Sequence, residues 1–163
     1  MSIKDLTQKS FSVLIIRSFG VLLLFGFTLF ITNFYSAENV GRYDFVRSTL
    51  MVLGGISLMG TNQSIIYYSG LLNARKSIES IRSIYSQMLK IIFTLSLIIL
   101  GFFMIFFNES IINDIFKNRE SYSLILKTIL TLVFFAVTML NIDTIRALKK
   151  TILSEMYLSL IHI

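Results

Sequence analysis

The stretch Ser18–Ala37 reads SFGVLLLFGFTLFITNFYSA, which is 20 residues without a charged side chain. A membrane-spanning helix needs about 20 mostly apolar residues to cross a hydrocarbon core about 30 Å thick. Three further stretches have this character, with Lys127 as their one charge: Ser48–Ala74, Ile91–Asn108 and Ser121–Ile142. Together the four stretches hold 87 of the 163 residues, more than a soluble fold of this size can bury. The sequence therefore predicts an all-α, polytopic transmembrane helix bundle.

We expect four spans and the start of a fifth. The fifth is predicted from Thr151–Ile163, an apolar run of 13 residues. As a helix this run would be about 20 Å long, too short to cross the membrane core. The chain is therefore expected to be a fragment, residues 1–163 forming the N-terminal part of one helical bundle. The four complete spans are predicted near Val13–Tyr35, Phe45–Gly70, Met88–Phe107 and Tyr122–Ile142.

The loops between the predicted spans differ in their content of Lys and Arg. One side of the membrane receives nine of these residues, including Lys4, Arg75 and Arg146, and the other side receives four. Cytoplasmic loops carry the Lys/Arg excess, so the N-terminus is predicted to be cytoplasmic. The formal net charge of +6 is accordingly interpreted as loop charge, and no nucleic-acid partner is predicted.

Residues 71–90 are predicted to form an amphipathic cytoplasmic connector. Apolar side chains recur at helical spacing from Ile78 to Leu89, and basic side chains such as Arg82 fall on the opposite arc. Two interpretations stay open. The segment is either a helix on the inner membrane surface, as a lipid-binding or a solvated connector, or an inward extension of the third span.

Residues suited to enzyme catalysis or metal binding are scarce in this sequence. It contains no Cys, and its single His, His162, is the second-last residue. Gly54, Gly55 and Gly60 are not followed by the Lys-Ser/Thr pair of a phosphate-binding loop. The sequence therefore predicts a protein that is not an enzyme, with no cofactor and no metal site.

Arg17 is the first candidate site residue because it lies inside an apolar span. It is six residues into a helix expected to begin near Phe11, about 9 Å along the axis. Gly20 and Thr28 follow it on the same face. A cation at the centre of a membrane helix costs about 2.5–3.5 kcal/mol. Arg17 is therefore expected either to face a polar cavity or to extend to the inner headgroups.

The second span supplies the other candidates. Arg47 lies near its outer end, where the side chain either extends to the headgroups or faces a cavity. Asn62 and Gln63 belong to a polar run in its inner half, which suits contact with other helices or a cavity better than contact with lipid. Each of these amides either hydrogen-bonds between helices or contacts a ligand. The predicted substrate-binding residues are thus Arg17, Arg47, Asn62 and Gln63.

The order of several motifs resembles that of a known family. Arg17–Gly20 opens the first span, the loop FYSAENVGRYDF follows it, and GTNQSIIYYS ends the second span. A basic RALKK and then SEMYLSLI follow the fourth span. This arrangement resembles the N-terminal part of bacterial polysaccharide (O-antigen type) flippases, which belong to the multidrug/oligosaccharidyl-lipid/polysaccharide exporter superfamily. The resemblance covers essentially the whole chain and is most specific over Arg17–Ser69.

The resemblance implies a function in the cell inner membrane. Complete family members have about a dozen helices in two pseudo-symmetric bundles. They move an undecaprenyl-diphosphate-linked oligosaccharide repeat unit from the inner to the outer leaflet, for surface polysaccharide or lipopolysaccharide O-antigen synthesis. The implied partners are this lipid-linked substrate, membrane lipids, and the polysaccharide polymerase and glycosyltransferase machinery. Arg17 best matches an expected diphosphate contact, and Arg47 matches one less closely.

Two other functions stay open. One is a multidrug-type exporter fragment of the same superfamily, in which an acidic residue of the first bundle often couples transport to an ion. The predicted spans contain no interior Asp or Glu, and Asp143 lies just past the fourth, which favours the lipid-linked sugar. The other is a small four-span membrane scaffold protein.

Cysteine labelling tests the predicted orientation, because the chain has no native Cys. Single cysteines at Asn39 and Asn113 are expected to react with a membrane-impermeant thiol reagent in whole cells. A cysteine at Ser80 is expected to react only after lysis. Labelling of Ser80 in intact cells would reverse the orientation.

Overall fold

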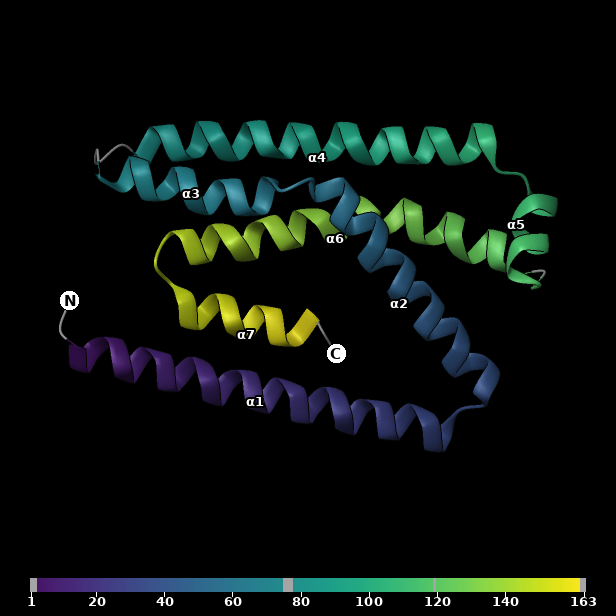
Figure 1. Ribbon diagram of the computed structural model, residues 1–163, viewed down its shortest axis with the longest axis horizontal. Helices are drawn as coiled ribbons and strands as arrows, with labels where there is room; N and C mark the ends of the chain where they lie inside the picture. The colour runs from purple at the N-terminus through teal and green to yellow at the C-terminus, as the bar shows by residue number, and fades with distance from the viewer. Residues whose placement is uncertain (1–2, 75–77, 119, 162–163) are drawn as a thin grey trace.

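The computed structural model describes residues 3–74, 78–118 and 120–161, without the side chains of residues 3–6, 9, 72–74, 78–80 and 160–161. All secondary structure in these ranges is helical, which confirms the all-α prediction (Figure 1). The helices, in chain order, are α1 (Ile3–Phe34), α2 (Ala37–Leu58), α3 (Thr61–Ala74), α4 (Ile78–Phe106), α5 (Glu109–Phe116), α6 (Ser121–Ala147) and α7 (Thr151–Ile161).

Three of the described helices are long and apolar enough to cross a membrane unaided. They contribute the segments Ser10–Phe34 of α1, Ile81–Phe106 of α4 and Ser121–Ala147 of α6. The pair α2 and α3 meets the same test only as one broken span. The described residues thus hold three membrane-length helices, or four with the broken pair, as expected of a multi-pass membrane protein.

The predicted span Phe45–Gly70 is not one straight helix. α2 and α3 meet at an angle of 45°, and the break lies at Met59 and Gly60, whose φ angles are +44° and +79°. A positive φ ends the regular helix, and glycine adopts it without steric cost. The Met59 N–H closes α2 by donating to the Gly55 carbonyl at 3.1 Å. Thr61 then begins α3, and its hydroxyl donates to the Leu58 carbonyl at 2.7 Å.

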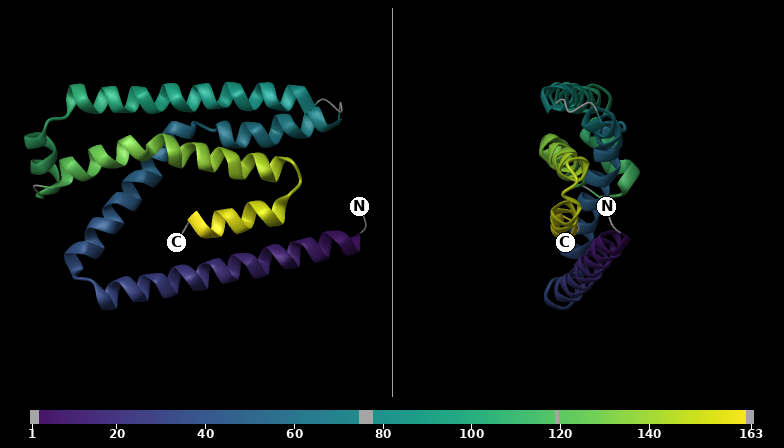
Figure 2. Two further views of the ribbon diagram at one scale, coloured as in Figure 1. Left: turned by 180° about the vertical axis from the view of Figure 1, so that it is seen from behind. Right: turned by 90° about the vertical axis from the view of Figure 1, so that its left-hand side faces the viewer.

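The long helices form a row in which α4 lies at one side and α1 at the other (Figure 1, Figure 2). Between them lie α3, α6 and α7, while α2 runs obliquely from the far end of α1 to the start of α3. α6 packs against α2, α3, α4, α5 and α7. α1 packs extensively only against α7, with a smaller contact to α2 near the Phe27 and Tyr43 rings. The position of α1 therefore depends mainly on α7.

Apolar side chains fill two clusters around α6. The larger joins α2, α3, α4 and α6 through Leu58, Ile65, Ile92 and Leu140. The smaller joins α4, α5 and α6 through buried residues that include Phe103 and Ile129. Polar contacts between helices accompany the first cluster: the buried hydroxyls of Ser57 on α2 and Ser96 on α4 lie 2.7 Å apart. Such small polar residues allow close helix packing in an apolar environment.

Apart from the α2–α3 break, which lies midway along the molecule, the described turns between helices lie at its two ends (Figure 1). The α1–α2 connection and α5 lie at one end, where Arg42 pairs with the Glu120 carboxylate at 2.8 Å. The start of α1, the end of α3 and the α6–α7 turn lie at the other end. α4 runs unbroken from Ile78 to Phe106, so the second half of the predicted connector is an extension of the third predicted span. Residues 75–77 of that connector lie outside the described residues.

Adjacent glycines on α2 provide a matched test of the packing between α2 and α6. A Cβ atom added at Gly54 would overlap the Phe135 ring, whereas one added at Gly55 would meet nothing within 4 Å. We expect Gly54→Leu to lower the free energy of unfolding in detergent by about 1–3 kcal/mol, the usual cost of overpacking. Gly55→Leu, which has the same helix propensity, should not lower it. Equal losses in the two variants would contradict this packing.

Candidate functional site

Arg17 of α1 forms a two-point ion pair with Glu155 of α7. Its Nε donates to Glu155 Oε2 and its Nη2 donates to Oε1, each at 2.8 Å. The Glu155 side chain is buried, with 5% of its surface exposed, whereas 60% of the Arg17 side chain is exposed. This fork-to-fork geometry is the strongest arrangement available to an arginine and a carboxylate. It joins two residues that are 138 positions apart in the chain.

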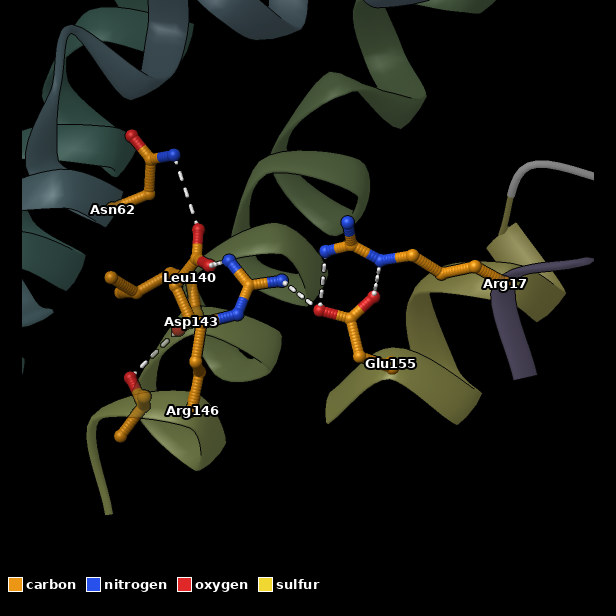
Figure 3. Close-up of polar contacts among 7 residues, drawn as sticks. Arg17, Asn62, Leu140, Asp143, Arg146 and Glu155 are labelled. Carbon is orange, nitrogen blue, oxygen red and sulfur yellow. Dashed lines mark hydrogen bonds and ion pairs between the residues drawn. The ribbon is translucent and has the colours of Figure 1, made fainter. Parts of the chain in front are cut away.

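The pair continues into a longer series of contacts (Figure 3). Glu155 Oε1 also accepts from Arg146 Nη2 at 3.3 Å, and Arg146 Nη1 donates to Asp143 Oδ1 at 2.6 Å. Asp143 Oδ2 accepts from Asn62 Nδ2 at 3.1 Å. We call these five residues the charged network. It connects α1, α7, α6 and α3.

The turn between α6 and α7 places Glu155 beside Arg146. Lys149 has a φ of +64°, and its N–H donates to the Arg146 carbonyl at 2.9 Å. The Lys150 N–H donates to the Ile145 carbonyl at 3.2 Å. These bonds end α6 and reverse the chain, so that α7 runs back along α6 (Figure 1). Glu155, in the second turn of α7, then lies against the last turns of α6.

Small residues bring α1 close enough for the ion pair. A Cβ atom added at Gly20 would lie 2.8 Å from both Cβ and Oγ of Ser159. Gly20 is one turn after Arg17, and Ser159 is one turn after Glu155, so the two contacts form along parallel helices. A shallow pocket of about 280 Å³ lies beside them, lined also by Val21, Leu24 and Leu158. Close packing and charge pairing thus act at the same place.

The network balances its own charge. It contains two guanidinium groups and two carboxylates, and each carboxylate touches an arginine. An unpaired charge costs several kcal/mol in a low-dielectric environment, and good hydrogen-bonding geometry offsets that cost. The two carboxylates, of Asp143 and Glu155, can therefore be buried between the helices without being left unpaired.

No family model, curated protein or solved structure matches the chain.

The structure brings two of the four predicted site residues into one network. Arg17 and Asn62 lie at its two ends. Gln63 is exposed on α3 and is not part of the network. Arg47 lines a different pocket, about 230 Å³ between α2 and α6, together with Tyr43 and Phe135. The Thr28 hydroxyl, expected on the same face as Arg17, donates to the Leu24 carbonyl of its own helix at 2.9 Å.

Three residues of the network, Asp143, Arg146 and Glu155, are not among the predicted site residues. The predicted fourth span ends at Ile142, whereas α6 continues to Ala147, so Asp143 and Arg146 lie on the same helix as that span. Asp143 and Arg146 are spaced i,i+3, which is a recognisable helical ion pair. Glu155 offered a signal too, as the one acidic residue in the apolar run Thr151–Ile163.

The described residues also limit what the network can do chemically. Within them, no group of three or more His, Cys, Asp or Glu side chains is placed to hold a metal ion.

Arg17 has five N–H donors, and two of them contact Glu155. The other three meet no partner among the described residues, and the third guanidinium nitrogen points away from Glu155 (Figure 3). Arg17 thus retains donors for an additional anion.

Proposed function

We propose that this chain contributes the first helices of a polysaccharide flippase of the cell inner membrane. The substrate is an undecaprenyl-diphosphate-linked oligosaccharide repeat unit for surface polysaccharide or O-antigen synthesis. The proposed partners are membrane lipids, this lipid-linked substrate, and the polymerase and glycosyltransferases that act on it. The family resemblance of the motifs supports this choice of substrate.

The observation that carries the proposal is the geometry of Arg17. A guanidinium group binds a phosphate with the same two-point geometry as a carboxylate. Arg17 lies within the membrane-length segment of α1, its side chain is 60% exposed, and three of its N–H donors are not used by Glu155. A diphosphate that crosses an apolar core needs such a cation, because an unpaired anion there is costly.

Asn62 and Gln63 have separate places in this proposal. Asn62 supports the site indirectly by holding Asp143, which in turn orients Arg146. Gln63 and Arg47 are proposed as secondary contacts for the sugar and the diphosphate. The pocket that Arg47 lines and the surface on which Gln63 is exposed are separate from the pocket beside the Arg17–Glu155 pair.

A cation-coupled multidrug exporter is the second candidate. One observation favours it: Asp143 and Glu155 are buried acidic side chains within the helical assembly. Such residues are typical of ion-coupling sites in membrane transporters. In this alternative Asp143→Asn would abolish resistance to cationic drugs and leave surface polysaccharide unchanged.

Substitution of Arg17 tests the flippase proposal in cells whose surface polysaccharide depends on this gene. Arg17→Ala should reduce polysaccharide display about tenfold or more at normal membrane abundance, since each charge-assisted hydrogen bond contributes about 1.5–3 kcal/mol. Arg17→Lys should retain partial display, because lysine keeps the charge and loses the two-point geometry.

Arg42 provides the matched control for this experiment. It is also an arginine that contacts two carboxylates, those of Glu38 and Glu120, but it lies at the opposite end of the molecule. Arg42→Ala should leave display close to normal. Normal display in the Arg17→Ala variant would remove Arg17 from the proposed site.

A further inference from the structure

The Glu155 carboxylate occupies the face of Arg17 that binds anions best. It takes the Nε and Nη2 donors together, which is the edge a phosphate group would use for two parallel hydrogen bonds. Glu155 Oε1, which accepts from Arg17 Nη2, also accepts from Arg146 Nη2 at 3.3 Å. Glu155 therefore lies between two cations, on a helix that also packs against both of their helices.

We infer that Glu155 competes with anionic ligands for Arg17. When a phosphate group binds Arg17, the Glu155 carboxylate gives up its contact with Arg17 and keeps its contact with Arg146. This inference rests on the proposed function, because it assigns a regulator to the same anion-binding residue. The class of ligand is a phosphate or diphosphate, either on an isoprenoid lipid or free.

The charges of the network make this exchange feasible. Glu155 does not become an unpaired buried anion when Arg17 turns to a phosphate, because Arg146 remains within hydrogen-bonding distance. Arg146 is fixed on its other side by Asp143 at 2.6 Å, so it stays in place as the second partner. Arg17 has room to turn toward a phosphate, since its side chain is 60% exposed, whereas that of Glu155 is 5% exposed and stays beside Arg146.

Direct binding measurements on the 163-residue chain in zwitterionic nanodiscs test the competition. The probes are geranylgeranyl diphosphate, inorganic diphosphate and, as the uncharged comparison, geranylgeraniol. Glu155→Gln removes the competing charge and keeps the side-chain shape. We expect it to bind geranylgeranyl diphosphate about fivefold more tightly than the parent chain, and geranylgeraniol no differently. Arg17→Ala should lose the diphosphate binding.

Glu38→Gln is the matched control, because it also removes one carboxylate from an arginine ion pair, at 2.9 Å from Arg42. It should change the affinity less than twofold, which excludes a general effect of net charge. If Glu155→Gln does not fold, Glu155→Asp replaces it. The shorter side chain keeps a carboxylate near Arg146 but reaches Arg17 less well, so the affinity should again rise.

The outcomes separate this inference from the proposed function. Unchanged or weaker diphosphate binding in folded Glu155→Gln or Glu155→Asp, with binding still lost in Arg17→Ala, would overturn the competition and leave the anion site standing. Equal binding in the parent chain and Arg17→Ala would overturn both. A gain seen with both diphosphates supports competition by a free or lipid-bound anion. A gain confined to geranylgeranyl diphosphate supports competition by the lipid.

Discussion

A cation within an apolar helix needs an anion, and this requirement fixes the position of α1. Arg17 meets it through the two bonds to Glu155 on α7. Because α7 is the main neighbour of α1, the pair lies at the joint between the first helix and the rest of the molecule. Gly20 and Ser159 let the two backbones approach, and the ion pair selects which turns of the helices face each other.

The charged network extends this constraint to the centre of the fold. Arg146 and Asp143 lie on the last turns of α6, the helix that contacts most of the others, and Asn62 lies on α3 just after the break at Gly60. A buried ion pair adds little net stability compared with apolar packing, but removal of one partner is costly. The network therefore favours the one arrangement of α1, α3, α6 and α7 in which every charged group keeps its partner. Any anion that binds Arg17 must enter this balanced set.

Much of the fold was predictable from composition. Stretches of membrane length with at most one charge identify α1, α4 and α6 because water and lipid impose opposite requirements on side chains. The break in the second span was only hinted at by its glycines, since composition does not specify a backbone dihedral angle. The predicted fourth span ends just before Asp143, whereas α6 continues to Ala147. The Asp143 carboxylate pairs with Arg146 and accepts a hydrogen bond from Asn62, contacts that composition does not reveal. The site was only partly predictable: depth in the span identified Arg17, but no local pattern reveals that it pairs with Glu155, 138 positions away. The predicted orientation and substrate remain predictions.

The coupling energy between Arg17 and Glu155 tests most directly the claim that their ion pair holds α1 in place. It is obtained from a double-mutant cycle of Arg17→Ala, Glu155→Ala and the double variant, with the free energy of unfolding measured for each in detergent micelles. We expect the double variant to lose less stability than the sum of the single losses, by about 0.5–3 kcal/mol, as for residues in contact. We also expect Glu155→Ala alone to cost more than Arg17→Ala, because it deprives two arginines of a partner. Losses that add to within about 0.3 kcal/mol would contradict the account.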